Sequence, residues 1–225
     1  MPVIIGHVSQ KGGTGKSTLA RALGAVVAGG GYKVTIADLD PSQDTVVEWD
    51  KLRDKNRLGP HINVQGFKTP AQAIARSDDD ELLIVDMPSG TSRNLLDLAE
   101  RADLLVQPTS GSLDELRPAV LFFHDLVREG IPRAKLVLAL SRTSSSSEED
   151  AARAYLAKAG YEVLAGSLPE SKGYRSAQNA GHAVTEVTQR ALREPAYDLM
   201  EALFERVSSQ VQAAASEKKK MRGGD

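Results

Sequence analysis

A glycine-rich segment between a short apolar run and a helical pattern is the feature that most limits how this chain can fold. The apolar run covers residues 3–8, the glycine-rich segment reads KGGTGKST over residues 11–18, and Leu19, Leu23 and Val26 then recur at helical spacing. In strand–turn–helix units of this kind, backbone N–H groups converge at the start of the helix, where the helix dipole is positive. The segment therefore predicts a phosphate-binding site at the carboxyl end of a buried strand.

This segment follows a variant of the nucleotide-binding P-loop. The strict pattern G-x-x-x-x-G-K-[ST] is not met, because Gln10 stands at its first glycine, but the variant K-G-G-x-G-K-[ST] is met in full. Lys16 is expected to neutralise charge on the β- and γ-phosphates, and Ser17 is expected to ligate Mg²⁺. The alternative is a glycine-rich turn that binds nothing. The predicted nucleotide-binding residues of the loop are Lys11, Gly12, Gly13, Thr14, Gly15, Lys16, Ser17 and Thr18.

The rest of the chain alternates short Val/Ile/Leu-rich runs with longer helical patterns, which is typical of repeated βαβ units. Strands are expected over residues 3–8, 33–38, 62–67, 82–86, 103–107, 135–140 and 162–165. Further helices are expected over residues 45–55, 71–76, 93–101, 113–128, 148–159 and 195–215. We therefore predict one α/β domain over residues 1–215, with a mostly parallel twisted sheet of about seven strands, helices on both faces, and a basic flexible tail over residues 216–225.

Composition excludes several classes of protein. The chain has no cysteine, so it cannot hold a thiolate-bound iron–sulfur cluster, a disulfide framework or a thiol nucleophile. Its net charge of -2 provides no overall basic field, so any contact with DNA must come from a local patch. No run reaches the roughly 18 apolar residues of a membrane span, and the apolar start is too short for a signal peptide. A cytoplasmic protein is expected.

The strand expected at residues 82–86 ends in a carboxylate, Asp86. Ligands of open α/β sheets bind outside the carboxyl ends of the strands, so Asp86 is placed to hold Mg²⁺ through water. An aspartate at the end of a strand is also common as a turn or cap residue. The glycine-rich segment favours the metal-binding interpretation.

Together these motifs resemble the ParA/MinD family of deviant Walker A (P-loop) ATPases, and in particular its short ParA-like members. The resemblance covers residues 2–190. Residues 38–43, DLDPSQ, are similar to the family's D-x-D-P-Q segment, with Ser42 inserted before the glutamine. The resemblance implies that Asp40 positions the attacking water and lies at the Mg²⁺ site with Ser17 and Asp86. Asp44 is either close to the Mg²⁺ ion or the N-cap of the next helix.

The resemblance also implies an ATP-dependent homodimer. Lys11 would reach across a two-fold axis to the partner's nucleotide, and dimer affinity would depend on the γ-phosphate that hydrolysis removes. Ser141 falls where the family usually has an asparagine at the start of a base-binding loop, and Pro169 falls where backbone groups meet the base. ATP and Mg²⁺ are the implied ligands, and Lys11, Lys16 and Asp40 are the implied catalytic residues.

Three functions remain open on this fold. A partition or positioning ATPase would bind nucleoid DNA non-specifically and be released when a ParB-like adaptor stimulates hydrolysis, so that a plasmid, chromosome region or protein cargo is moved. A membrane-cycling MinD-like ATPase would need a C-terminal helix with bulky apolar anchors, of which the tail offers only Met221. An ATP-dependent ligase of small molecules is disfavoured by Lys11 and by the segment at residues 38–43.

Basic side chains near the C-terminus are the candidates for contact with DNA. Residues 190–225 hold seven Lys or Arg against six Asp or Glu, so a solvated helix face is the alternative. The charges are nevertheless segregated, because the lysines of the tail are consecutive. The predicted DNA-binding residues are Arg175, Arg190, Arg193, Arg206, Lys218, Lys219 and Lys220.

Overall fold

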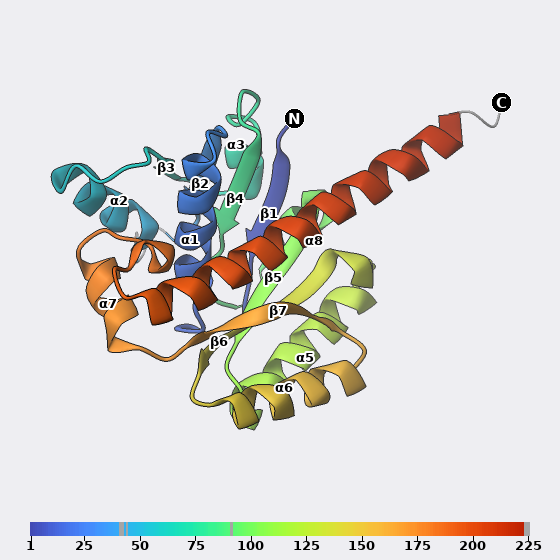
Figure 1. Cartoon of the computed structure of the whole chain (residues 1–225). Coiled ribbons are helices and arrows are strands. Elements are labelled where there is room, and N and C mark those ends of the chain that lie inside the picture. Colours follow the sequence, from blue (N-terminus) through green and yellow to red (C-terminus); the bar gives the residue numbers. More distant parts are fainter. Residues whose placement is uncertain (41–42, 44, 91, 223–225) are drawn as a thin grey trace.

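Seven strands form a single parallel sheet at the centre of the molecule (Figure 1). The computed structural model describes residues 1–225 except 41–42, 44, 91 and 223–225, and it describes side chains as far as residue 212. The strands are β1 (Val3–His7), β2 (Val34–Asp38), β3 (Asn63–Gly66), β4 (Leu82–Asp86), β5 (Leu104–Thr109), β6 (Leu136–Thr143) and β7 (Glu162–Pro169). They lie in the order β3-β2-β4-β1-β5-β6-β7, and every neighbouring pair is parallel.

Helices cover both faces of this sheet. They are α1 (Lys16–Gly29), α2 (Thr45–Lys55), α3 (Pro70–Ile74), α4 (Arg93–Arg101), α5 (Leu113–Arg128), α6 (Ser146–Lys158), α7 (Lys172–Asn179) and α8 (Arg190–Arg222), with short 3₁₀ turns η1 (Arg133–Lys135) and η2 (Val184–Glu186). Successive strand residues alternate between two cores: Ile5 packs with α1, α2, α7 and α8, whereas Ile4 packs with α3 to α6. The predicted parallel α/β architecture is confirmed.

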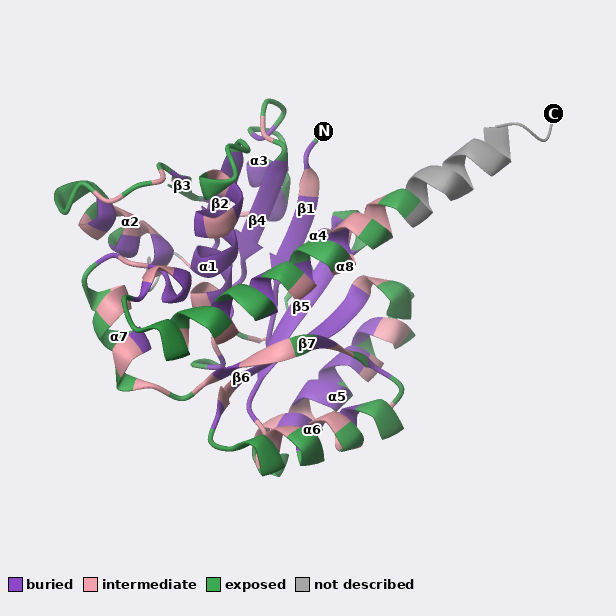
Figure 2. Ribbon diagram, viewed as in Figure 1, coloured by how far each residue is buried: buried purple, intermediate pink, exposed green. Residues whose placement is uncertain are grey.

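The five inner strands are almost wholly buried, whereas the edge strands β3 and β7 are partly exposed and α8 is exposed along its outer side (Figure 2). Parallel strands covered on both faces bury apolar side chains in both directions, which is why their sequences are continuous apolar runs. At the carboxyl edge, the register places Asp86 of β4 opposite both Asp38 of β2 and His7 of β1. Three ionisable residues therefore meet at one point of the sheet edge.

Helices α3 and α6 differ from their predicted bounds by one or two residues at each end, and larger differences occur at α8 and α7. Helix α8 runs from Arg190 to Arg222 instead of over 195–215, because its first turn carries no apolar stripe to reveal it. Helix α7 was not predicted at all; it is short and polar, buries only Tyr174, and is capped by the Ser171 side chain, which accepts a hydrogen bond from the Gly173 amide.

Some predicted features fall partly or wholly outside the described residues. They are the switch-loop residues Pro41, Ser42 and Asp44, and the side chains of the tail predicted over 216–225. Among the helices that the structure describes, none is both long and apolar enough to cross a membrane.

Candidate nucleotide-binding site

The glycine-rich loop connects the buried end of β1 to the start of α1. Gly13 and Gly15 have φ values of 74° and 112°, a backbone region that side chains with a Cβ rarely adopt. Gly15 is also the N-cap of α1 and provides no side chain to bond the first amides of the helix. These amides and the positive end of the helix dipole are therefore available to an anion. The local geometry is that of a phosphate cradle.

Lys16 lies in the first turn of α1 and is largely buried, with 7% of its surface exposed. Its Nζ donates a 2.9 Å hydrogen bond to the Ser89 Oγ, in the segment that follows β4. Burial lowers the Lys16 pKa, and the negative charges of Asp86 and Asp40 counteract that effect. The side chain is thus held near the carboxylates of Asp86 and Asp40.

Asp86 has the properties of a magnesium ligand. It is buried at the end of β4, and its Oδ1 has no hydrogen-bond partner within the described part of the chain. Burial raises the Asp86 pKa to about 7, while a hydrogen bond from Ser17 opposes the rise. An unsatisfied buried carboxylate oxygen beside a serine hydroxyl fits a hard divalent cation, which prefers oxygen ligands. Ser17 and Asp86 are the residues that would hold Mg²⁺.

Asp38 organises the segment that contains Asp40. Its Oδ2 accepts hydrogen bonds from the Val46 and Val47 amides at 2.8 and 3.4 Å, at the start of α2. Its Oδ1 accepts a 3.0 Å bond from the Asp40 amide. Asp40 itself is half-buried and close enough to Lys16 for their charges to interact. The structure therefore brings Asp40, Lys16 and Asp86 together, as predicted.

Lys11 stands apart from this cluster. It is exposed, and its Nζ donates a 2.6 Å hydrogen bond to the Asp114 carbonyl in the first turn of α5. The backbone in that turn is fixed by Glu115, which accepts two hydrogen bonds from Arg142 Nη2, at 2.7 and 2.8 Å. Lys11 is thus placed at the outer rim of the loop, away from Lys16.

Other predicted nucleotide contacts lie at the same edge of the sheet. Ser141 of β6 is buried directly behind the loop, since a Cβ built on Gly15 would come within 3.0 Å of its Oγ. Pro169 ends β7 and pairs with Thr143 of β6. The Thr18 hydroxyl points instead to α7, where it donates a 3.2 Å bond to Gln178 Oε1.

The predicted DNA-binding arginines fall into two places. Tyr174 donates a 2.6 Å hydrogen bond to the Leu192 carbonyl, so α7, which carries Arg175, packs against the first turn of α8, which carries Arg190 and Arg193. Arg175 pairs with Glu170 at 3.3 Å, and Arg190 with Glu194 at 2.6 Å, both on the surface.

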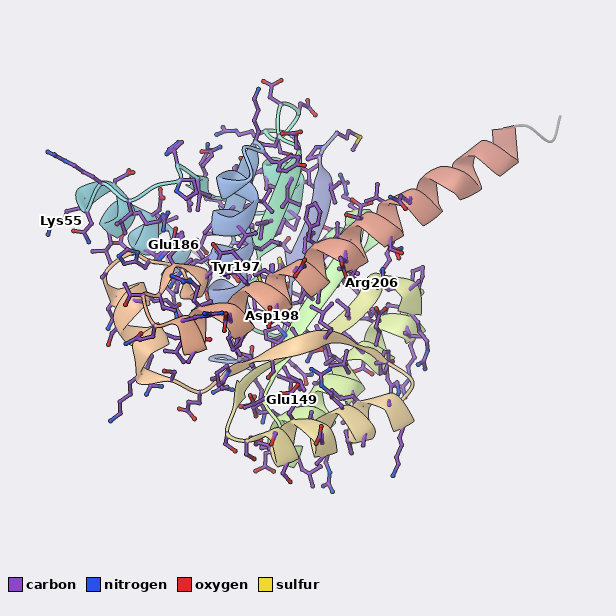
Figure 3. The ribbon with its side chains drawn as sticks, viewed as in Figure 1. Lys55, Glu149, Glu186, Tyr197, Asp198 and Arg206 are labelled. Carbon is purple, nitrogen blue, oxygen red and sulfur yellow. The ribbon has the colours of Figure 1, made fainter. Side chains whose placement is uncertain are left out.

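Arg206 lies farther along α8 (Figure 3). Its side chain is only 15% exposed, and it pairs with Glu162 at 2.7 Å and bonds the Ala134 carbonyl. The side chains of Lys218, Lys219 and Lys220 lie outside the described residues. The structure thus groups Arg175, Arg190 and Arg193, and it separates Arg206 from them.

Sequence reasoning missed several residues that shape the site. Ser89 had a readable signal, because it follows Asp86 at the carboxyl edge of the sheet. Arg21 and Gln178 had none: Arg21 is a buried cation in an apolar helix face, and Gln178 lies on the unpredicted α7. The two residues bond each other across 157 positions of the chain.

Comparisons with known proteins agree with this geometry. The ParA protein of Rhizobium radiobacter is 27% identical over 181 residues, covering 77% of this chain and 81% of that protein. The MinC:MinD cell division complex of Aquifex aeolicus has a TM-score of 0.74 at 16% identity, covering 90% of this chain and 96% of that one. MinD of Pyrococcus horikoshii complexed with Mg-ADP has a TM-score of 0.70 at 19% identity, covering 93% and 99%.

The sequence profile of the CobQ/CobB/MinD/ParA nucleotide-binding domain matches residues 5–184, which include the loop, Asp40, Asp86 and Ser141. This match covers most of the chain and every residue of the phosphate cradle. The chain therefore belongs to the CobQ/CobB/MinD/ParA family of nucleotide-binding domains, with the parallel P-loop fold of ParA and MinD proteins.

Proposed function

We propose that this protein is a Mg²⁺-dependent, ParA-like partition or positioning ATPase. Its ATP-bound homodimer would bind DNA non-specifically and be released after hydrolysis stimulated by a ParB-like adaptor, in the cytoplasm and on the nucleoid. The proposal rests on the separate placement of the two lysines of the loop. Lys16 lies beside Asp40 and Asp86, whereas Lys11 is exposed at the rim of the loop.

In the proposed reaction the triphosphate lies in the cradle of residues 11–18. Lys16 neutralises charge on the β- and γ-phosphates, and Ser17 and Asp86 hold Mg²⁺, which supplies further neutralisation of the phosphate oxygens. Asp40 orients a water and accepts its proton as the water oxygen bonds to the γ-phosphorus. The bond from the γ-phosphorus to the bridging oxygen breaks, and ADP and phosphate are released.

Lys11 is the residue proposed to join two protomers. To reach a partner's nucleotide it must leave the Asp114 carbonyl, a single exposed hydrogen bond that costs little to exchange. Sedimentation with ATP and Mg²⁺ should show a monomer-to-dimer shift that Lys11→Ala abolishes. Lys16→Ala should lose nucleotide binding itself, because it removes the direct counter-charge of the phosphates. An unchanged ATP-dependent dimer of Lys11→Ala would contradict the two-fold arrangement.

The proposed DNA surface is the α7–α8 junction with Arg175, Arg190 and Arg193, together with the lysines of the tail. The ion pairs of Arg175 and Arg190 are exposed, so they contribute little and can be exchanged for phosphate contacts. Arg206 offers a matched control, because Glu162 and the Ala134 carbonyl already occupy its guanidinium.

A duplex-DNA shift assay with ATP tests this surface. The double variant Arg190→Ala/Arg193→Ala should bind DNA more weakly. The slope of the log binding constant against log salt should become shallower by about 0.9 for each phosphate contact that is lost. Arg206→Ala should change neither by much, and dimerisation should persist in both variants. Co-sedimentation with anionic liposomes is the parallel experiment: liposome binding without a DNA shift would favour the MinD-like, membrane-cycling alternative.

A further inference from the structure

A buried arginine links the phosphate-binding helix to two other elements. Arg21 lies one turn after Ser17 on the same side of α1, and only 7% of its surface is exposed. Burial lowers its pKa to about 10, while the negative charges of Asp86 and Asp38 act in the opposite direction. The guanidinium is therefore charged at neutral pH and lies near the carboxylates of the site.

The contacts of Arg21 lie on α2 and α7. Its Nη2 donates to the carbonyl of Thr45, the first residue of α2, and its Nη1 donates a 3.2 Å bond to Gln178 Oε1 on α7. Its Cζ lies 5.3 Å from the centre of the Trp49 ring. Gln178 Oε1 also accepts the 3.2 Å bond from Thr18, so two polar side chains of α1, Thr18 and Arg21, converge on one amide of α7.

The Thr45 contact matters because of what precedes α2. Thr45 is the first residue of α2 and lies five positions after Asp40 in the chain. The Asp38 carboxylate fixes the Asp40 amide at one end and the Val46 amide at the other. Arg21 ties the Thr45 carbonyl to the helix that begins with Lys16. The start of α2 is thereby set relative to the phosphate cradle.

Helix α2 is in turn fixed to the chain that follows α7. Trp49 Nε1 donates a 3.2 Å bond to the His182 carbonyl, and Arg53 pairs with Glu186 (labelled in Figure 3) through two bonds of 2.6 and 3.0 Å. A Cβ on Gly181 would come within 2.8 Å of the Arg53 amide nitrogen, so the two backbones are in close contact. The guanidinium groups of Arg53 and Arg21 both lie over the Trp49 ring, with Cζ-to-centroid distances of 4.9 and 5.3 Å.

We propose that Arg21 is a positioning residue for hydrolysis: it holds Thr45 and the start of α2 in place relative to the phosphate-binding helix, and it links them to α7 through Gln178. The Asp38 carboxylate, which accepts from the Val46 and Asp40 amides, then keeps Asp40 in position. This inference rests on the ATPase activity proposed above. It extends that activity because the contacts described for Arg21 are with Thr45, Gln178 and Trp49, none of which is a predicted phosphate or metal ligand. Displacing a catalytic group by about 1 Å costs on the order of 10²-fold in rate.

Four variants test the inference. Arg21→Met removes both donors and keeps an unbranched apolar side chain; Gln178→Leu removes the shared acceptor, and Gln178→Glu retains an acceptor oxygen. Arg76→Met is the matched control, since Arg76 is an exposed arginine away from this cluster. For each variant, kcat of basal ATP hydrolysis, Kd for ATP with Mg²⁺, and the emission of the single tryptophan, Trp49, are measured on the full chain.

Arg21→Met should lower kcat by on the order of 10²-fold while leaving Kd within about threefold, and it should abolish the change in Trp49 emission on addition of ATP. Gln178→Leu should reduce both kcat and the emission change, and Gln178→Glu should restore them. A merely structural role would lower stability without separating Gln178→Leu from Gln178→Glu.

If Arg21→Met does not fold, the two Gln178 variants decide the question. Wild-type kcat in Gln178→Leu, or in a folded Arg21→Met, would overturn the inference and leave the proposed function intact. A wild-type protein that neither binds nor hydrolyses ATP would instead overturn the proposed function, and the inference with it.

Discussion

The buried histidine beneath the phosphate cradle should make stability depend on pH in a way that one substitution reveals. His7 is fully buried, and both ring nitrogens are without a hydrogen-bond partner among the residues that the structure describes. Burial, and secondarily the charge of Lys16, lowers its pKa from 6.5 to about 3. Between these two values the unfolded chain binds a proton that the folded chain does not. The contribution of His7 therefore destabilises the fold as the pH falls below 6.5.

The magnitude follows from proton linkage. One proton bound only in the unfolded state changes the free energy of unfolding by about 1.4 kcal/mol per pH unit. Integrated between about pH 6.5 and about pH 4.5, with the pKa values of 6.5 and about 3, the loss is about 2 kcal/mol. His7→Leu removes this term, so the variant should gain about 2 kcal/mol relative to the wild type over that interval.

Asp86 acts in the opposite direction and must be separated from His7. Its pKa is raised from 3.8 to about 7, so between these values the folded chain binds the extra proton. Its contribution is present at low pH and is lost as the pH rises toward 7. The two slopes partly cancel in the wild type. For this reason the prediction is a difference between variant and wild type at each pH, in which Asp86 and the surface carboxylates cancel.

Urea unfolding of the full chain without nucleotide or Mg²⁺ provides the measurement, at about pH 4.5, 5.5 and 6.5. His61→Leu is the matched control, because it removes a histidine that is exposed at the surface. The difference between His7→Leu and wild type should grow steadily as the pH falls, whatever constant offset the new side chain introduces. A difference that stays constant across the three pH values would refute the buried, neutral state of His7.

Three further outcomes are expected. Asp40→Ala should bind ATP and form the dimer in sedimentation, yet release phosphate from ATP at least ~10²-fold more slowly than the wild type. Equal turnover would show that Asp40 has no role in hydrolysis. Arg53→Met should lower the free energy of unfolding by about 3 kcal/mol, because it leaves the partly buried Glu186 carboxylate without its cation. Gly181→Ala should cost about 2 kcal/mol or more in the same urea assay, since φ is 85° and the new Cβ would meet the Arg53 amide; a neutral effect would contradict the close packing of α2.

The parts of the fold that were predicted correctly are those encoded by local patterns. Strand β4 and helices α2, α4 and α5 have their predicted bounds, because a buried parallel strand is a short apolar run and a half-buried helix repeats its apolar residues every three to four positions. The phosphate-binding loop was predicted for the same reason: one contiguous motif specifies six of its eight residues, and its place after β1 follows from the order of the chain.

The parts that were missed depend on contacts between distant segments. Helix α7 has too few apolar residues to show a period, and it is held by Tyr174 and by the α2 contacts of the chain that follows it. Arg206 carries the same charge in the sequence as Arg193, but only the fold places Glu162 of β7 against it. Pairing of a charged side chain across 44 positions leaves no trace in a single sequence, because either partner alone reads as an ordinary surface residue.

The balance of buried charge gives a physical reason for a second lysine in the loop. Lys16 and Arg21 face Asp38, Asp86 and the half-buried Asp40, so the cations of the site are already matched by carboxylates before a nucleotide enters. A nucleoside triphosphate carries more negative charge than one Mg²⁺ neutralises, and in a site shielded from water the remainder requires a further cation. Lys11 can supply that charge only after its Nζ leaves the Asp114 carbonyl at the rim of its own loop. A lysine delivered by a second protomer would meet the need only while the γ-phosphate is present, which would make association of two chains depend on the state of the nucleotide.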